Sequence, residues 1–137
     1  MKNIQNKLML NTDEIIETTL SKTTRNVLMN HLSSFQNNDL DAVMSDYTSE
    51  SVLITQAATY TGTEEIKIFF ADLVIHFPKQ KSNFELDIIE VKDELALIVW
   101  HAKTPSLEVS LGTDTFILKD GKIYQQTFVG QLIWNQV

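Results

Sequence analysis

The first half of the chain has apolar residues every three or four positions, which is the period of an amphipathic helix. This spacing predicts helices over residues 23–36, 40–47 and 64–76. Asp39 and Thr63 stand directly before the second and third of these helices. Both residue types favour the N-cap position, because the side-chain oxygen accepts a backbone N–H that has no partner inside the helix.

Beyond Pro78, which ends the third helix, apolar and polar residues alternate, as they do along a half-buried strand. The strands predicted in this part cover residues 83–89, 95–102, about 107–118 and about 122–134. A further short strand, residues 51–55, is predicted between the second and third helices. The alternation slips at Ile88-Ile89, which indicates a β-bulge. Helices followed by a run of antiparallel strands predict an α+β fold with helices on one face of a sheet.

One domain, residues 23–137, accounts for this pattern, and residues 1–22 are expected to form an N-terminal extension that is loosely ordered or helical. The 137 residues are the usual size of one compact domain. The first ten residues lack the apolar core of a signal peptide, and no stretch reaches membrane-spanning length. A cytoplasmic location is therefore expected.

The charge balance and residue types narrow the possible functions. Lys and Arg number 11 against 18 Asp and Glu, a formal net charge of -7, which argues against binding to nucleic acid or to an anionic membrane surface. The chain has no cysteine, so it has no disulfide, thiolate nucleophile or cysteine-based zinc site. Three scattered histidines and four glycines form no metal-binding motif and no phosphate loop, so we expect no metal and no cofactor.

The stretch GTDTFILKDGKI, residues 112–123, is typical of a β-hairpin. Asp120-Gly121 suits a two-residue type I′ turn, in which both positions have φ > 0. Because side chains alternate along a strand, Asp114 shares a face with Phe116 and Leu118. Burying an unpaired charge is costly, so this carboxylate is either at the edge of the core, paired, protonated or functional.

Several stretches together resemble one known family. FQNNDLDAVMSDYTSESVLIT, YTGTEEIKIFFADL and TDTFILKDGKI followed by QTF are similar, in order and spacing, to the nuclear-transport-factor-2-like superfamily. The nearest members are polyketide-cyclase-like (SnoaL-like) and ketosteroid-isomerase-like proteins, and the resemblance covers residues 23–134. It implies a cone-shaped, curved, mainly antiparallel sheet wrapped around three helices, with an internal pocket. It also implies a homodimer formed through the sheet, with which large residues such as Trp134 are consistent.

The resemblance to ketosteroid isomerases assigns candidate roles to three positions. Asp114 matches the aspartic acid of the oxyanion hole, and His31 stands where those enzymes have a tyrosine. Thr55 stands where they have the general base, and threonine cannot serve as a base near neutral pH. Asp114 and His31 are therefore the catalytic candidates. The alternatives are a strand-end carboxylate bonded to its neighbours and a hydrogen-bonded core histidine.

Further residues are expected to line the pocket. They are Tyr47, Phe69, Phe70, Trp100, His101, Phe116, Tyr124, Gln126 and Phe128. Trp100 and His101 are adjacent and must face opposite ways: the family register turns His101 inward, whereas residue type favours Trp100 as a pocket wall. His76 is expected at a helix end.

Two functions remain open from the sequence. One is a cofactor-independent isomerase, dehydratase or cyclase that acts by proton transfer on a small, apolar, carbonyl-bearing metabolite. The other is a non-catalytic small-molecule-binding or dimerisation module of the same fold.

Overall fold

The computed structural model describes residues 17–135, so most of the expected N-terminal extension lies outside the described residues. The described helices and strands are α2 (Thr19–Gln36), α3 (Leu40–Met44), β1 (Tyr47–Thr55), β2 (Thr59–Thr61), α4 (Gly62–Ile75), β3 (Asn83–Lys92), β4 (Leu95–Lys103), β5 (Leu107–Lys119) and β6 (Lys122–Trp134). The strands form one sheet in the order β2-β1-β6-β5-β4-β3. Neighbouring strands are antiparallel except β1 and β6, which are parallel.

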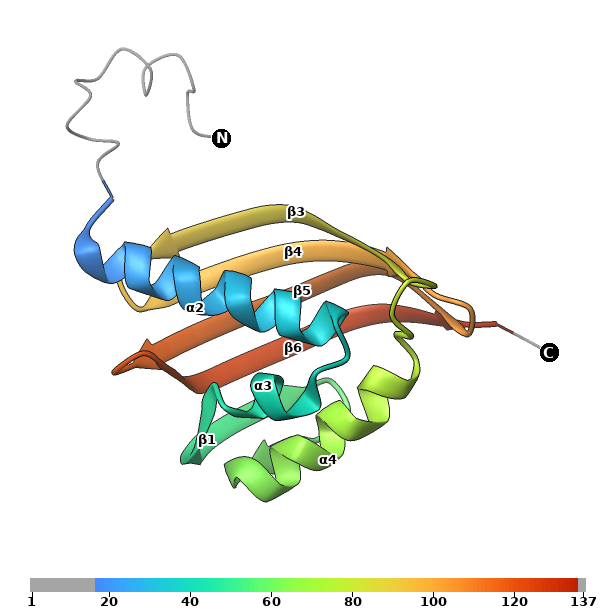
Figure 1. Ribbon diagram of the computed structural model, residues 1–137, viewed down its shortest axis with the longest axis horizontal. Helices are drawn as coiled ribbons and strands as arrows, with labels where there is room; N and C mark the ends of the chain where they lie inside the picture. Colours follow the sequence, from blue (N-terminus) through green and yellow to red (C-terminus); the bar gives the residue numbers. More distant parts are fainter. Residues whose placement is uncertain (1–16, 136–137) are drawn as a thin grey trace, which may run out of the picture.

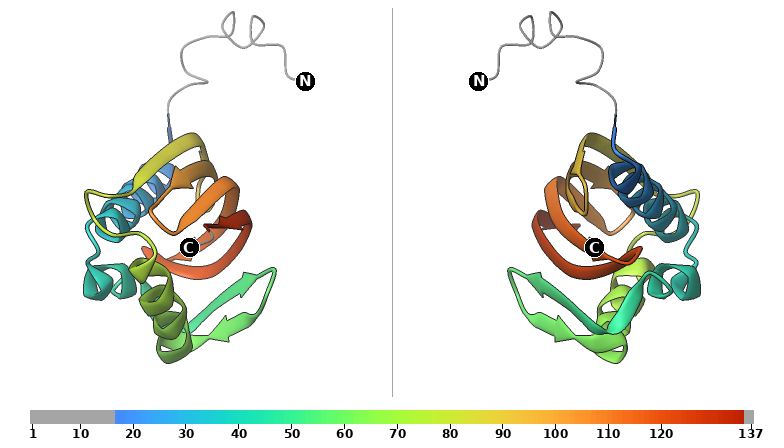
Figure 2. Two further views of the ribbon diagram at one scale, coloured as in Figure 1. Left: turned by 90° about the vertical axis from the view of Figure 1, so that its right-hand side faces the viewer. Right: turned by 90° about the vertical axis from the view of Figure 1, so that its left-hand side faces the viewer.

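The sheet curls without closing into a barrel, and the helices lie against its concave face (Figure 1). In the end-on views α2 lies inside the curve formed by β3 to β6, and α4 lies beside the β1–β2 hairpin (Figure 2). The predicted α+β class is therefore confirmed. Within the described residues, no helix is both long and apolar enough to cross a membrane.

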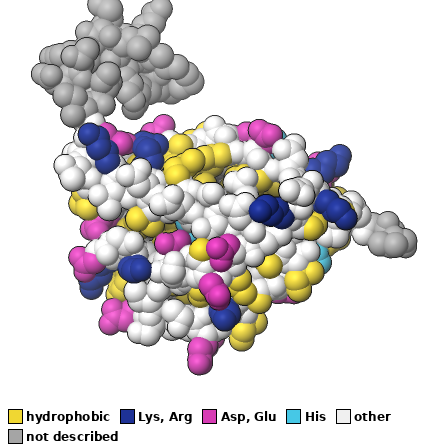
Figure 3. Space-filling view, in the orientation of Figure 1, with side chains coloured by type: hydrophobic (Ala, Val, Ile, Leu, Met, Phe, Trp, Pro, Cys, Tyr) yellow, Lys and Arg dark blue, Asp and Glu magenta, His cyan; other side chains and the backbone are white. Residues whose placement is uncertain are grey.

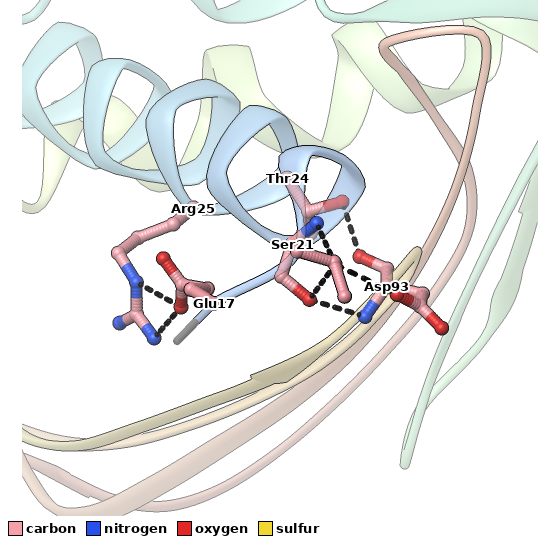
Figure 4. A network of polar contacts seen from close by, with 6 residues as sticks. Glu17, Ser21, Thr24, Arg25 and Asp93 are labelled. Carbon is pink, nitrogen blue, oxygen red and sulfur yellow. Dashed lines mark hydrogen bonds and ion pairs between the residues drawn. The ribbon is translucent and has the colours of Figure 1, made fainter. Parts of the chain in front are cut away.

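Helix α2 begins at Thr19, four residues before the predicted start at Thr23, because polar contacts hold its first turn against the β3–β4 turn (Figure 4). The Thr24 hydroxyl donates to the Asp93 carbonyl oxygen at 2.6 Å, and the Asp93 backbone N–H donates to the Ser21 hydroxyl oxygen at 2.7 Å. Ser21 and Thr24 are buried although they are polar. The spacing of apolar residues could not predict this turn, because the residues that it buries are polar and are held by hydrogen bonds.

Three other predicted boundaries are also wrong. Helix α3 ends at Met44, and Tyr47 already belongs to β1, which starts four residues before the predicted Ser51. The N-cap of α4 is Thr61 rather than Thr63. There the Glu65 carboxylate reaches back and accepts the Thr61 backbone N–H at 2.8 Å, which satisfies a donor at the helix start.

The strand details agree more closely with the sequence pattern. Asp120 and Gly121 have φ of 52° and 75°, as the predicted turn requires. In β3 the register shifts between Leu86 and Ile88, next to the predicted slip, and this bulge helps to bend the sheet over the helices.

Candidate functional site

A cavity of about 50 Å³ lies between the concave face of the sheet and helices α2 and α4. Its lining residues are His31, Leu32, Phe35, Phe69, Phe70, Leu73, Phe84, Ile98, Trp100, Asp114, Phe116, Gln126 and Phe128. Only His31, Asp114 and Gln126 bring strongly polar groups to this otherwise apolar wall. The cavity has room for one or two water molecules, given that water occupies about 30 Å³ in the liquid.

Asp114 on β5 is the carboxylic acid of this cavity, and its side chain points inward with only 7% of the residue exposed. Its Oδ1 accepts the indole N–H of Trp100 at 2.8 Å, and its Oδ2 accepts an amide N–H of Gln126 at 2.9 Å. Burial raises the pKa of Asp114 to about 6, although these two hydrogen bonds and the nearby His31 act in the opposite direction. Both forms of the carboxyl group are therefore accessible near neutral pH.

The Trp100 indole reaches Asp114 because the facing residue on β5 is glycine. Gly112 pairs with Trp100 across the two strands, and a Cβ atom at Gly112 would lie 2.4 Å from Trp100 Cε2. Phe128 stacks on the indole at 5.8 Å between ring centroids, and Phe84 packs on it at 5.1 Å. The indole is thus held between two aromatic rings with its single donor aimed at the carboxylate.

A second arm of polar contacts leads from Asp114 back to α2. Gln126 Oε1 accepts the Tyr47 hydroxyl at 2.5 Å, and Tyr47 Oη lies 3.2 Å from His31 Nε2. His31 Nδ1 lies 2.8 Å from Oδ2 of Asp46, a carboxylate at the turn between α3 and β1. Burial and the carboxylates of Asp114 and Asp46 raise the pKa of Tyr47 well above its ordinary value, so this hydroxyl stays protonated.

The structure places His31 and Asp114 on one cavity, but Tyr47 and Gln126 stand between them and the two side chains do not contact each other. Of the further residues expected to line the cavity, six do so: Phe69, Phe70, Trp100, Phe116, Gln126 and Phe128. Tyr47 is buried directly behind the wall. Asp46 was not predicted, because nothing in its sequence context distinguishes it from an ordinary residue at a helix end.

Two expected pocket residues lie elsewhere, which corrects the sequence-based expectation. His101 faces the outer side of the sheet, where its Nδ1 lies 2.7 Å from Oδ2 of Asp87, and this hydrogen bond raises its pKa. Because Gly112 has no side chain, the Trp100 indole fits over it on the inner face of the sheet. Its neighbour His101 therefore points to the outer face. Tyr124 falls at a register shift between the pairs Ile123–Leu118 and Gln125–Ile117, and its ring lies 5.2 Å from Lys119 Nζ.

Neither Thr55 nor His76 reaches the cavity. The Thr55 hydroxyl donates to the Ala58 carbonyl oxygen at 3.2 Å and accepts the Ala57 and Ala58 backbone N–H groups at 3.1 Å, so it stabilises the β1–β2 turn. His76 stands at the end of α4 as expected, with Nδ1 3.0 Å from the Ser106 hydroxyl oxygen. Among residues 17–135, no three His, Asp or Glu side chains are placed to hold a metal ion.

Comparisons with known proteins agree with this architecture. No family sequence model and no curated protein sequence matches the chain. In structure, it is similar to an NTF2-like protein of unknown function from Mesorhizobium loti, with a TM-score of 0.70, 17% identity and coverage of 85% of this chain and 97% of that one. This is the fold of the nuclear-transport-factor-2-like superfamily.

Two further solved structures of this fold come from proteins described as enzymes. One is described as a ketosteroid isomerase from Kribbella flavida, with a TM-score of 0.68, 8% identity and coverage of 85% of this chain and 84% of that one. The other is an epoxide hydrolase/cyclase-like enzyme of pyran ring formation in the polyether salinomycin, with a TM-score of 0.69, 13% identity and coverage of 80% and 92%. At these identities the likeness establishes the fold and not the reaction.

Proposed function

We propose that this NTF2-like chain binds a small, apolar, carbonyl-bearing metabolite and that Asp114 transfers a proton to or from it. The reaction class is isomerisation, dehydration or cyclisation, which needs only proton transfer and stabilisation of an enolate oxygen. The observation that supports the proposal most is a buried carboxyl group, with its pKa raised to about 6, that faces an apolar cavity. A group that titrates near the working pH both gives and takes protons efficiently.

His31 and Gln126 are the partners of Asp114 in this proposal. Both lie on the cavity wall. Gln126 has a second amide N–H besides the one donated to Asp114, which can donate to a developing oxyanion, and His31 positions Gln126 through Tyr47. The aromatic and aliphatic side chains around them exclude water, and electrostatic interactions are stronger in such a medium than in solution. The apolar wall therefore favours an apolar ligand with one carbonyl group.

A metabolite needs more room than the cavity of about 50 Å³ offers, so ligand entry requires a side chain to move. Phe84 is the best placed, because it lines this cavity and also two outer grooves of about 290 Å³ and 200 Å³. The larger groove runs between α2 and β3, where hydrophobic side chains gather on the surface (Figure 3). We propose that rotation of Phe84 joins this groove to the cavity.

The test is proton exchange, which requires no knowledge of the natural substrate. The full-length protein is incubated in D₂O with a panel of small cyclic ketones and enones, and NMR follows the replacement of hydrogens beside the carbonyl by deuterium. Wild-type protein is expected to accelerate this exchange and Asp114→Asn to return it to the rate without protein. Asp87→Asn is the matched control, because Asp87 also pairs with a histidine but lies on the outer face. Exchange that persists undiminished in Asp114→Asn removes Asp114 from the reaction.

The second candidate function is a non-catalytic binding module with the same cavity. The observation in its favour is that Asp114 is the one carboxylate among the cavity residues described, while Thr55 is engaged in a turn. Binding of the ketones, detected by line broadening of their signals, without deuterium exchange would support this candidate. Failure of the whole panel to bind would contradict both functions.

We also propose that the protein is a homodimer formed through the outer face of the sheet. Six apolar side chains on this face are 39% to 54% exposed: Ile54, Leu95, Leu97, Leu111, Ile117 and Val129. Uncharged Thr and Gln side chains stand between them in the strand register, as in the cross-strand pairs Ile54–Thr127 and Thr115–Leu97. An apolar sheet face of this kind favours contact with another surface.

A further inference from the structure

Five polar side chains cross the interior in one line, which we name the buried polar chain: Asp46, His31, Tyr47, Gln126 and Asp114. Its atoms fix the direction of its hydrogen bonds. Tyr47 Oη and Gln126 Oε1 are 2.5 Å apart, and two oxygens approach this closely only with a proton between them. The Tyr47 hydroxyl therefore donates to Gln126, and the Gln126 amide N–H donates to an Asp114 oxygen 2.9 Å away.

This direction determines the protons on His31. Since the Tyr47 proton points at Gln126, Tyr47 Oη can only accept from His31 Nε2, 3.2 Å away. On the other side, His31 Nδ1 donates to the Asp46 carboxylate at 2.8 Å. Both ring nitrogens then carry protons, so His31 is positively charged while Asp114 is negatively charged.

The same five residues satisfy every bond in a second arrangement. His31 gives up its Nε2 proton, Tyr47 turns its hydroxyl to donate to that nitrogen, and the Gln126 amide turns so that its N–H donates to Tyr47 Oη. Gln126 Oε1 then accepts from Asp114, which gains one proton on Oδ2. One N–H bond of His31 has been exchanged for one O–H bond of Asp114, and the total charge is unchanged.

A change of proton on one of the two residues alone leaves a mismatch in this order. If His31 loses its Nε2 proton while Asp114 stays ionised, either two oxygens face each other beside Gln126 or the bare Nε2 faces the Tyr47 oxygen. Such a mismatch is costly in a buried site, because bulk water cannot reach these groups freely to compensate it. We propose that His31 and Asp114 hold one proton between them, and that the Gln126 amide turns over when the proton moves from one to the other.

Among the described residues that line the cavity, those outside the buried polar chain carry no titratable side chain. Helix α4 and strand β3 present only apolar side chains to the cavity, from Phe69, Phe70, Leu73 and Phe84. At the other end Lys122 donates to the Ser45 carbonyl oxygen at 2.7 Å, beside Asp46. The titratable groups that face one another are thus Asp46, His31, Tyr47 and Asp114. Asp46, with 20% of its side chain exposed, connects them to solvent.

In the proposed ligand site, the shared proton gives His31 a second function. A carbonyl oxygen that accepts a hydrogen bond from Asp114 favours the arrangement in which Asp114 holds the proton and His31 is neutral. This consequence rests on the proposed function, whereas the shared proton does not and can be tested without a ligand.

The experiment follows the ¹⁵N signals of the His31 ring in the full-length protein between pH 5 and 8. Asp114→Asn presents an N–H to Gln126, as protonated Asp114 does, so it selects the second arrangement. The ratio of charged to neutral His31 is expected to fall several-fold in this variant at a given pH. Asp87→Asn is the control and should change only the signals of His101.

A second pair of variants separates the hydrogen-bonded chain from simple attraction through space. Tyr47→Phe removes the hydroxyl and retains the ring, and Gln126→Met retains the approximate length of the side chain. In either background Asp114→Asn is expected to have less than half its effect on His31, since the chain is interrupted while the charges stay in place. An equal effect in both backgrounds would show simple attraction and overturn the proposal. An unchanged His31 in Asp114→Asn alone would overturn it as well.

Discussion

The Trp100 indole N–H donates to the Asp114 carboxylate at 2.8 Å, and it can do so only because Gly112 lies beneath the indole ring. The two residues that bond belong to adjacent strands, and the glycine that permits their contact is two positions before Asp114 on the same face of β5. A missing side chain therefore positions the donor that stabilises the ionised form of the site.

Gly112→Ala is expected to displace the indole and break its bond to Asp114. The new Cβ would lie 2.4 Å from Trp100 Cε2, closer than two carbon atoms can approach. Overpacking of this kind costs about 1–3 kcal/mol. Denaturant unfolding measures this loss, and tryptophan emission in a Trp134→Phe background reports Trp100 alone, since the chain has two tryptophans.

Thr113→Ala is the control for this substitution. Thr113 follows Gly112 on β5, so its side chain points to the opposite face of the sheet, and it pairs with Val129. It should leave the Trp100 emission unchanged. An unaltered emission spectrum in Gly112→Ala would contradict the proposed dependence of Trp100 on the glycine.

The stability of the wild-type protein is expected to fall as the pH rises from 4 to 7, relative to Asp114→Asn. The pKa of Asp114 is raised from 3.8 to about 6 on folding, so the folded protein binds this proton more tightly than the unfolded chain. The stabilisation is complete below pH 4 and is lost as the pH passes 6. About two pKa units correspond to about 3 kcal/mol.

Urea unfolding at several pH values measures this difference for both proteins. Asp114→Asn has no titratable group at this position. Its free energy of unfolding should therefore not show the decrease between pH 4 and 7 that is expected for the wild type. Asp72→Asn replaces an exposed carboxylate on α4 and is the control that should follow the wild type. Parallel curves for wild type and Asp114→Asn would contradict the raised pKa.

Phe84→Ala is expected to open the cavity to the groove between α2 and β3. Removing this half-buried ring costs about 2–3 kcal/mol of stability, somewhat below the value for a fully buried phenylalanine. Small apolar ketones should bind faster and more tightly, because no side chain needs to rotate. Relaxation-dispersion NMR measures the association and dissociation rates of the ketone, and their ratio gives the affinity.

Leu86→Ala is the matched variant for this prediction, because Leu86 lines the outer groove but not the cavity. It should leave ketone binding nearly unchanged. Equal effects of the two substitutions would show that Phe84 does not separate the groove from the cavity.

Ile117→Lys is expected to halve the mass of the protein in solution at micromolar concentration. Ile117 lies on the outer sheet face and is 40% exposed, so in a dimer a charge there would be buried without a partner. Sedimentation equilibrium gives the mass. Ile68→Lys, on α4 and 67% exposed, is the control and should retain the dimer. A wild-type protein that is already monomeric would refute the dimer.

Local sequence patterns were sufficient for much of the fold. The apolar spacing locates three helices, and the pair Asp120-Gly121 predicts the last hairpin, because Asp and Gly readily adopt the two positive φ angles of a type I′ turn. The pairing of β1 with β6 lies outside such reasoning, since 79 residues separate Tyr47 from its hydrogen-bond partner Gln126. Helix ends were also misjudged where hydrogen bonds to distant residues bury polar side chains.

For the site, the sequence by itself determined that Asp114 shares a strand face with apolar residues and that His31 lies in an apolar helix stripe. Only the tertiary structure decided that Trp100 turns inward, that a bulge excludes Tyr124 and that Asp46 completes the buried polar chain. The physical reason is that strand alternation gives two possible faces, and the choice depends on the space left by a residue of another strand. Here that space is left by Gly112.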